Sequence, residues 1–136
     1  IAAGISFSRC NCPQSATLGV WTQDLDAARE LAKRENKYLF INFTGSDWCG
    51  WCKLMDEHVF SQPGWKEFAE KNLALAFIDF PRDKSLVPEG YRARNRQLKE
   101  QYGVRGYPTF IVCGPDGHLA GELGSKAAPN ILLSLM

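Results

Sequence analysis

The chain has 136 residues, of which 45% are hydrophobic and 23% are charged, so its size and composition are those of one globular domain rather than a disordered segment. The 16 Lys and Arg residues nearly balance the 15 Asp and Glu residues, which leaves no basic footprint for nucleic acid and no polybasic patch for a membrane surface. No apolar run approaches the roughly 18 residues that a membrane helix needs, so we expect no membrane insertion.

The first half of the chain alternates helical and extended patterns. Residues 1–19 show no periodicity, and we expect a tail there and a folded domain over 20–136. Asp24 is a good N-cap for a helix that ends at Asn36-Lys37. The run 38–43 predicts a buried strand, followed by a loop over 44–47 and a helix from about Cys49 to residue 59 or 60. A short helix after Pro63-Gly64 and a buried strand over 73–80 complete this half.

The second half ends in a hairpin. After a loop over 81–88, a helical face over 91–102 is closed by Gly103, and residues 109–113 read as a strand. A turn at 115–117 leads into a returning strand over 118–123, and a short helix is expected around 131–135. Strands that alternate with helices favour a parallel sheet, and the hairpin adds antiparallel strands, so we predict an α/β fold with a mixed central sheet flanked by helices.

Cysteine is the residue type that indicates chemistry. The five cysteines are an odd number, so at least one thiol is unpaired or pairs between chains. Cys49 and Cys52 form a Cys-x-x-Cys pair at the start of a predicted helix. Residues three apart on a helix are surface neighbours, so this spacing allows a disulfide within one turn.

The two sulfurs of this pair are not equivalent. Cys49 is expected at the helix N-terminus, where unpaired N–H groups favour a thiolate, whereas Cys52 lies one turn further in and is more enclosed. We therefore predict that Cys49 attacks a substrate disulfide and that Cys52 resolves the mixed disulfide.

Three segments together resemble the thioredoxin superfamily. Trp48-Cys49-Gly50-Trp51-Cys52-Lys53 after a buried strand resembles its active-site motif, Gly106-Tyr107-Pro108-Thr109-Phe110 is similar to its cis-proline segment, and Pro115-Asp116-Gly117 is similar to its final hairpin. The resemblance covers roughly residues 21–136. Within the superfamily the chain looks most like exported bacterial members, such as the periplasmic domain of transmembrane thiol-disulfide interchange reductases.

The resemblance implies a thioredoxin-like fold and thiol-disulfide oxidoreduction on protein disulfides. It implies a cis peptide at Tyr107-Pro108, and the expected substrate-binding residues are Trp48, Gly50, Trp51, Tyr107 and Pro108. No organic cofactor or metal is needed, and electrons must pass to or from another redox protein. The direction of electron flow stays open. We expect a monomer in the bacterial periplasm or outside the cell, with the cytoplasm as the alternative location.

The chain also departs from the superfamily. The buried carboxylate that usually precedes the motif aligns with Asn42, which cannot take a proton, and the lysine that commonly partners it aligns with Leu75. Asp56, four residues after Cys52, is a possible substitute, although a plain surface carboxylate is the alternative interpretation.

Two other functions stay open at this stage. The fold could serve as a binding or adaptor module with permanently oxidised cysteines, or Cys49 and Cys52 could join Cys10 and Cys12 in a structural zinc site. We interpret Cys10 and Cys12 as incidental tail thiols and Cys113 as a small core residue. The remaining interpretations are structural, with core aromatics at Trp21 and Trp65 and a solvated helix face over Arg92, Arg94 and Arg96.

Overall fold

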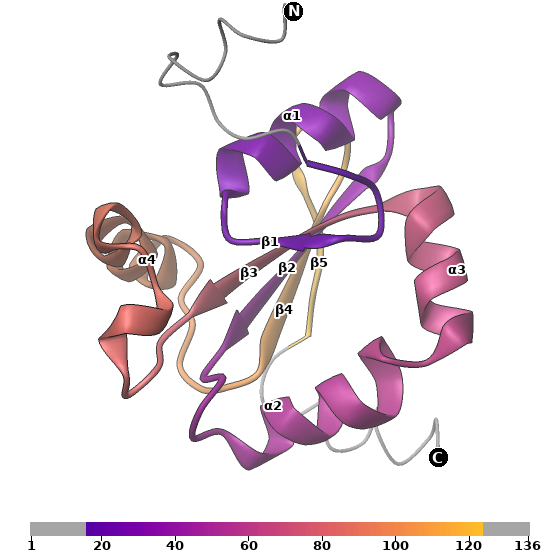
Figure 1. The fold of residues 1–136 in the computed structure, drawn as a ribbon. Coiled ribbons are helices and arrows are strands. Elements are labelled where there is room, and N and C mark those ends of the chain that lie inside the picture. Colours follow the sequence, from indigo (N-terminus) through magenta and orange to yellow (C-terminus); the bar gives the residue numbers. More distant parts are fainter. Residues whose placement is uncertain (1–15, 124–136) are drawn as a thin grey trace, which may run out of the picture.

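The computed structural model describes residues 16–123, which form a five-stranded sheet with helices on both faces (Figure 1). In chain order the elements are β1 (Trp21–Thr22), α1 (Leu25–Glu35), β2 (Tyr38–Thr44), α2 (Gly50–Met55), the π-helical η2 (Asp56–Phe60), α3 (Pro63–Asn72), β3 (Leu73–Asp79), the 3₁₀ turn η3 (Lys84–Leu86), α4 (Glu89–Gln101), β4 (Thr109–Cys113) and β5 (Leu119–Leu123). The strand order is β1-β3-β2-β4-β5. The first three strands in this order are parallel, and β4 and β5 are antiparallel, as the sequence predicted.

Side-chain alternation along the strands divides the core between the two faces of the sheet. Residues at alternate positions of β2, such as Leu39, Ile41 and Phe43, pack against α1 and the end of α4. On the other face, Phe40 and Phe110 pack with residues of α2, η2 and α3. Burying each of these large apolar side chains contributes about 1.5–3 kcal/mol.

Helix ends follow the local signals in the sequence. The Asp24 side chain accepts a hydrogen bond from the Ala27 N–H (3.0 Å) at the start of α1, and Asn36 adopts a left-handed conformation (φ 55°) at its end. Gly103 follows α4 with φ +63°, a backbone angle that glycine adopts without strain. These two predicted helix ends are confirmed.

Three features of the fold were not predicted. Trp21–Thr22 forms a two-residue strand parallel to β3, which is too short to show a periodic pattern. The helix that begins after Cys49 changes to π-helical geometry over Asp56–Phe60. Residues of the expected tail contact the domain, since Ala16 and Leu18 pack against the core and the Gly19 N–H donates to the Leu73 carbonyl (3.0 Å).

The predicted helix around 131–135, most of the expected tail, and Cys10 and Cys12 lie outside the described residues. Within residues 16–123, none of the helices combines the length and apolar character that a membrane crossing requires.

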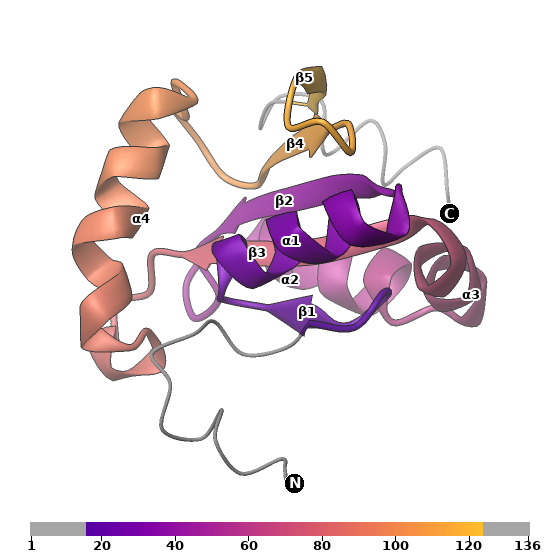
Figure 2. The same cartoon turned by 90° about the horizontal axis from the view of Figure 1, so that it is seen from above.

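The topology brings three loops together at one end of the central strands. The parallel strands β2 and β3 end side by side at Thr44 and Asp79, and antiparallel β4 begins next to them at Thr109. Figure 2 shows α4 and α3 on opposite sides of the molecule, with the sheet between them. The loops after β2, after β3 and before β4 therefore lie together at the carboxyl end of the parallel strands.

Candidate active site

The Cys-x-x-Cys pair follows the turn that ends β2. The carbonyl oxygen of Gly45 accepts hydrogen bonds from the Trp48 N–H (3.2 Å) and the Cys49 N–H (2.9 Å). Cys49 has extended backbone angles (φ −83°, ψ 108°) and is the N-cap of α2. This geometry confirms the expectation that the first cysteine lies at the start of a helix.

Cys49 and Cys52 are joined in a disulfide, with their Cα atoms 5.2 Å apart. Both residues are buried, at 5% and 3% exposure, so the expected difference in enclosure between them is very small. The difference between the sulfurs lies in hydrogen bonding, because the Cys52 N–H donates to Cys49 Sγ (3.2 Å). Such a donor favours negative charge on the Cys49 sulfur in the reduced pair.

Hydrogen bonds connect the loop between β2 and α2, which we call the active-site loop, to the end of β3. The buried carboxylate of Asp79 accepts hydrogen bonds from the Ser46 N–H (2.9 Å) and the Ser46 hydroxyl (2.5 Å). The Asp47 carboxylate accepts from the backbone N–H groups of Asp83 and Arg82 (both 2.9 Å), and these two bonds hold the pKa of Asp47 below its usual value. Sequence reasoning missed this network, and its only signal was a carboxylate at the end of an apolar strand.

The proline segment lies against the same loop. The indole N–H of Trp48 donates to the Phe80 carbonyl (2.7 Å), and the Trp48 and Tyr107 rings meet edge to face with centroids 5.5 Å apart. The Tyr107–Pro108 peptide bond is cis, as the resemblance implied. The Pro108 side chain is fully buried.

Two indole rings stand exposed around the buried disulfide. Trp48 is 38% exposed and Trp51 is 43% exposed, and Gly50 between the cysteines is open to solvent. A partly exposed Trp combines a large apolar surface with a polar edge, which suits contact with a peptide. The structure thus brings Trp48 and Tyr107 together and presents Gly50 and Trp51 at the surface.

A pocket of about 370 Å³ lies between the sheet and η2, and its lining includes the polar residues Asn42, Ser46 and Asp56 beside the ring of Phe77. Asn42 is 5% exposed, and its Oδ1 atom has no hydrogen-bond partner among the described residues. Asp56 lines the same pocket, where partial burial raises the pKa of its carboxyl and the nearby charges of Asp79 and Glu57 raise it further. The pocket is therefore lined both by the Asn42 amide oxygen, which has no partner among the described residues, and by the Asp56 carboxyl, which takes up a proton more readily than usual.

The strand register refines the comparison with the superfamily. Asn42 lies opposite Phe77 on β3, whereas Leu75 lies opposite Phe40. Both β3 residues are apolar, so neither provides the amine that commonly accompanies the buried carboxylate.

The other thiol in the described chain is structural. Cys113 is buried in the core, and burial raises the pKa of its thiol, which matches the predicted role as a small core residue. Trp21 and Trp65 pack in the aromatic cluster around Phe40 and Phe60, also as predicted. Between residues 16 and 123, no group of three or more His, Cys, Asp or Glu side chains is arranged to hold a metal ion.

A family model described as thioredoxin-like matches residues 20–115. The chain is 36% identical over 97 residues to the disulfide bond reductase DsbH of Chlamydia pneumoniae, covering 71% of this chain and 58% of that protein. It is 30% identical over 110 residues to the thiol:disulfide interchange protein DsbD of Pseudomonas fluorescens, covering 76% of this chain and 17% of that protein.

Solved structures give the same result. A DsbH oxidoreductase superposes with a TM-score of 0.71 at 31% identity, covering 89% of this chain and 85% of the other. A thioredoxin from Thermus thermophilus superposes with a TM-score of 0.59 at 25% identity, covering 90% of this chain and 85% of the other. These likenesses confirm the predicted fold class, although the chain spans less than two thirds of the length of the two curated relatives.

Proposed function

The chain belongs to the thioredoxin-like family of thiol-disulfide oxidoreductases, and on this basis we propose that it exchanges disulfides with protein substrates through Cys49 and Cys52. The observation that carries the proposal is the hydrogen bond from the Cys52 N–H to Cys49 Sγ, because it gives the two sulfurs different roles. This hydrogen bond lies at the carboxyl ends of the parallel strands, where open α/β folds bind their ligands.

In the reductive direction, the Cys49 thiolate attacks one sulfur of a substrate disulfide. A mixed disulfide forms, and the other substrate sulfur leaves as a thiolate that takes up a proton. Cys52 then loses its proton and attacks Cys49 Sγ, which releases the second substrate thiolate. Two electrons pass from the protein dithiol to the substrate, and the Cys49–Cys52 disulfide remains.

Asp56 is the proposed acceptor of the Cys52 proton. The support is structural, since the Asp56 N–H donates to the Cys52 carbonyl one helical turn away and its carboxyl lines the pocket that contains Asn42. The pKa of the Asp56 carboxyl is raised toward neutral pH, and a carboxylate with a higher pKa is a better proton acceptor.

The proposed direction is reduction of substrate disulfides. It is supported by the name disulfide bond reductase that one curated relative carries. A reductase needs a second redox protein to return electrons to Cys49–Cys52, and the interchange protein among the relatives is of the kind that could do so. We propose that the protein works as a monomer in the bacterial periplasm or outside the cell. Equilibration with glutathione would test the direction, and a reduction potential near that of strong oxidants, about −120 mV, would reverse it.

Trapping experiments test the roles of the two cysteines. Reduced Cys52→Ser should accumulate a mixed disulfide with unfolded substrates that still contain a disulfide, because nothing resolves the first adduct, whereas reduced Cys49→Ser should not. Non-reducing gels and mass spectrometry measure the adduct. Equal trapping by both variants would refute the assignment of roles.

Reduction of insulin in the presence of dithiothreitol tests the activity itself. The wild type should accelerate precipitation of the insulin B chain, and Cys49→Ser should abolish the acceleration. Cys113→Ala is the matched control, because it removes a buried thiol from the core on the side of the sheet opposite α2. A wild type with no effect above dithiothreitol alone would favour a binding module over an enzyme.

A further inference from the structure

A second groove lies beside the candidate active site, between the loop after β3 and helix α4. Its volume is about 340 Å³. The apolar part of the lining is Phe80, Pro81 and Val87, and the cationic part is Lys84, Arg92 and Arg96. An apolar surface with cations around it can hold both the stem and the head of an acidic side chain.

Among residues 16–123, no carboxylate forms an ion pair with any of the three cations. Arg92 donates to the backbone carbonyls of Val87 (3.2 Å) and Lys84 (2.8 Å), and these two hydrogen bonds hold its side chain in place. Lys84 and Arg96 are exposed, and within the described part of the chain their side chains form no ion pair. The one acidic residue in the lining, Asp79, is buried and accepts both of its short hydrogen bonds from Ser46.

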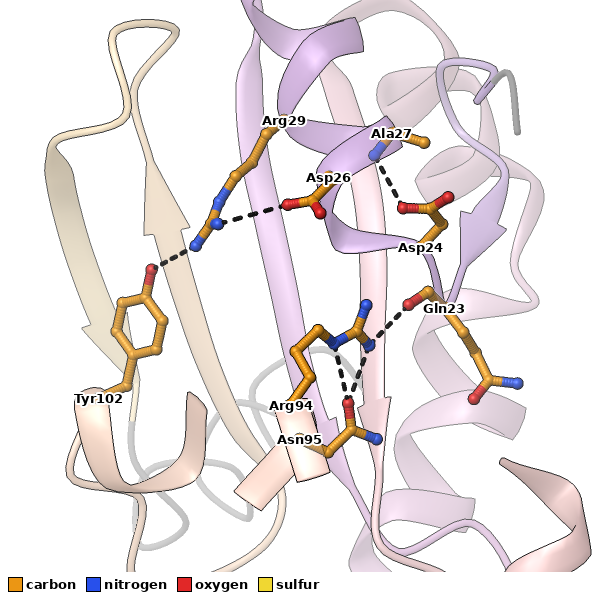
Figure 3. Close-up of polar contacts among 8 residues, drawn as sticks. All are labelled: Gln23, Asp24, Asp26, Ala27, Arg29, Arg94, Asn95 and Tyr102. Atoms are coloured by element: carbon orange, nitrogen blue, oxygen red, sulfur yellow. Dashed lines mark hydrogen bonds and ion pairs between the residues drawn. The ribbon is translucent and has the colours of Figure 1, made fainter. Parts of the chain in front are cut away.

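The structure corrects the expectation of one solvated arginine face on this helix. Arg94 turns away from the groove toward the start of α1, where it donates to the Gln23 carbonyl (2.9 Å) and the Asn95 side chain (2.8 Å), as Figure 3 shows. Arg92 and Arg96 are four residues apart, which places them on one side of α4, and both line the groove. The three arginines therefore lie in two different environments, Arg92 and Arg96 in the groove and Arg94 beside the start of α1.

The groove is continuous with the residues proposed to contact substrate. Phe80 lines it, and the Phe80 carbonyl accepts the hydrogen bond from the Trp48 indole (2.7 Å). The Phe80 and Tyr107 ring centroids are 5.5 Å apart, and Lys99 Nζ lies 5.9 Å and 5.7 Å from these two rings. A peptide that reached Cys49 past Trp48 and Tyr107 would meet this cationic surface next.

We propose that this basic groove docks an acidic segment of the partner protein, adjacent to the cysteine that Cys49 attacks. The inference rests on the proposed disulfide exchange and adds the chemistry of its partner. Phe80 and Pro81, which are half-buried, contact the apolar stem of the acidic residue, and Lys84, Arg92 and Arg96 face its carboxylate. Complementary charge at the edge of an interface mainly accelerates association and selects partners.

Synthetic peptides test the groove directly. Three disulfide-containing peptides of equal length would differ only in three residues flanking one cysteine, which are acidic, serine or lysine. The rate constant for reduction by the dithiol form of the protein is measured for each peptide at about 20 mM and about 0.5 M NaCl, since salt screens surface charges. The acidic peptide should react about tenfold faster than the serine peptide at low salt, and the ratio should approach one at high salt.

Charge-reversal variants locate the effect. Lys84→Glu and Arg96→Glu should each reduce the ratio of acidic to serine rates several-fold, and the double variant should favour the lysine peptide. Lys33→Glu is the matched control, because it makes the same change of net charge on the exposed last turn of α1, beside the 114–117 turn, and should leave the ratio unchanged.

Two results would overturn the inference. One is an equal rate for the acidic and serine peptides in the wild type at low salt, and the other is an equal fall of the ratio in Lys33→Glu and Arg96→Glu. Failure of the proposed function is separately visible, because then the wild type would reduce no peptide faster than Cys49→Ser does.

Discussion

Asp79 provides the most direct test of how the fold holds the active-site loop. Its buried carboxylate accepts one hydrogen bond from the Ser46 N–H and a second from the Ser46 hydroxyl. A hydrogen bond to a charged group contributes roughly 1.5–3 kcal/mol, and Ser46 is only half-buried, so water partly replaces the lost acceptor. We therefore expect Asp79→Ala to lower the free energy of unfolding by about 3 kcal/mol, which corresponds to a fall in Tm of roughly 10 °C.

Asp79→Asn is the matched variant. The asparagine side chain keeps the shape, its oxygen can accept from the Ser46 N–H, and its amide can donate to the Ser46 hydroxyl, so we expect a loss of under about 1 kcal/mol. Urea unfolding followed by tryptophan fluorescence measures both variants, and the alkylation rate of Cys49 in the reduced protein reports whether the loop has moved. Equal destabilisation by alanine and asparagine would show that the charge matters and that the hydrogen-bond argument is wrong.

Two further substitutions test the pocket and the turn beside the site. The pKa of the Asp56 carboxyl is raised in the folded protein, so its contribution to stability is complete at pH values below its ordinary pKa of 3.8. This contribution is lost as the pH rises through the raised pKa. Asp56→Asn should therefore raise the free energy of unfolding at pH 7 by under about 1 kcal/mol, a small gain because solvent screens the carboxyl, and the gain should vanish near pH 3 in urea titrations. The same variant should slow the step that resolves the mixed disulfide, seen as a longer-lived adduct in quenched reactions, and an unchanged lifetime would exclude Asp56 as the proton acceptor. Gly45→Ala would place a methyl group in steric overlap with the Trp48 indole, which is held by its hydrogen bond to the Phe80 carbonyl. We therefore expect about 2 kcal/mol of destabilisation and a shifted tryptophan emission. A wild-type spectrum and stability would contradict this packing.

Local patterns were sufficient for most of the secondary structure. The Asp24 cap, the apolar run 38–43 and the glycine after α4 predicted element ends that the structure confirms, since each depends on contacts within a few residues. β1 was not predictable in this way, because its two residues are held by pairing with a strand about 50 residues later.

The spacing of Cys49 and Cys52 and their position at a helix start could be predicted from the sequence, because both depend on one turn of backbone. Their surroundings depend on how distant segments pack together. Asp79 reaches Ser46 across 33 positions, and Arg92 and Arg94, two residues apart on one helix, face different surfaces. A side chain's partner depends on which distant segment the fold brings beside it, and no local pattern encodes that choice.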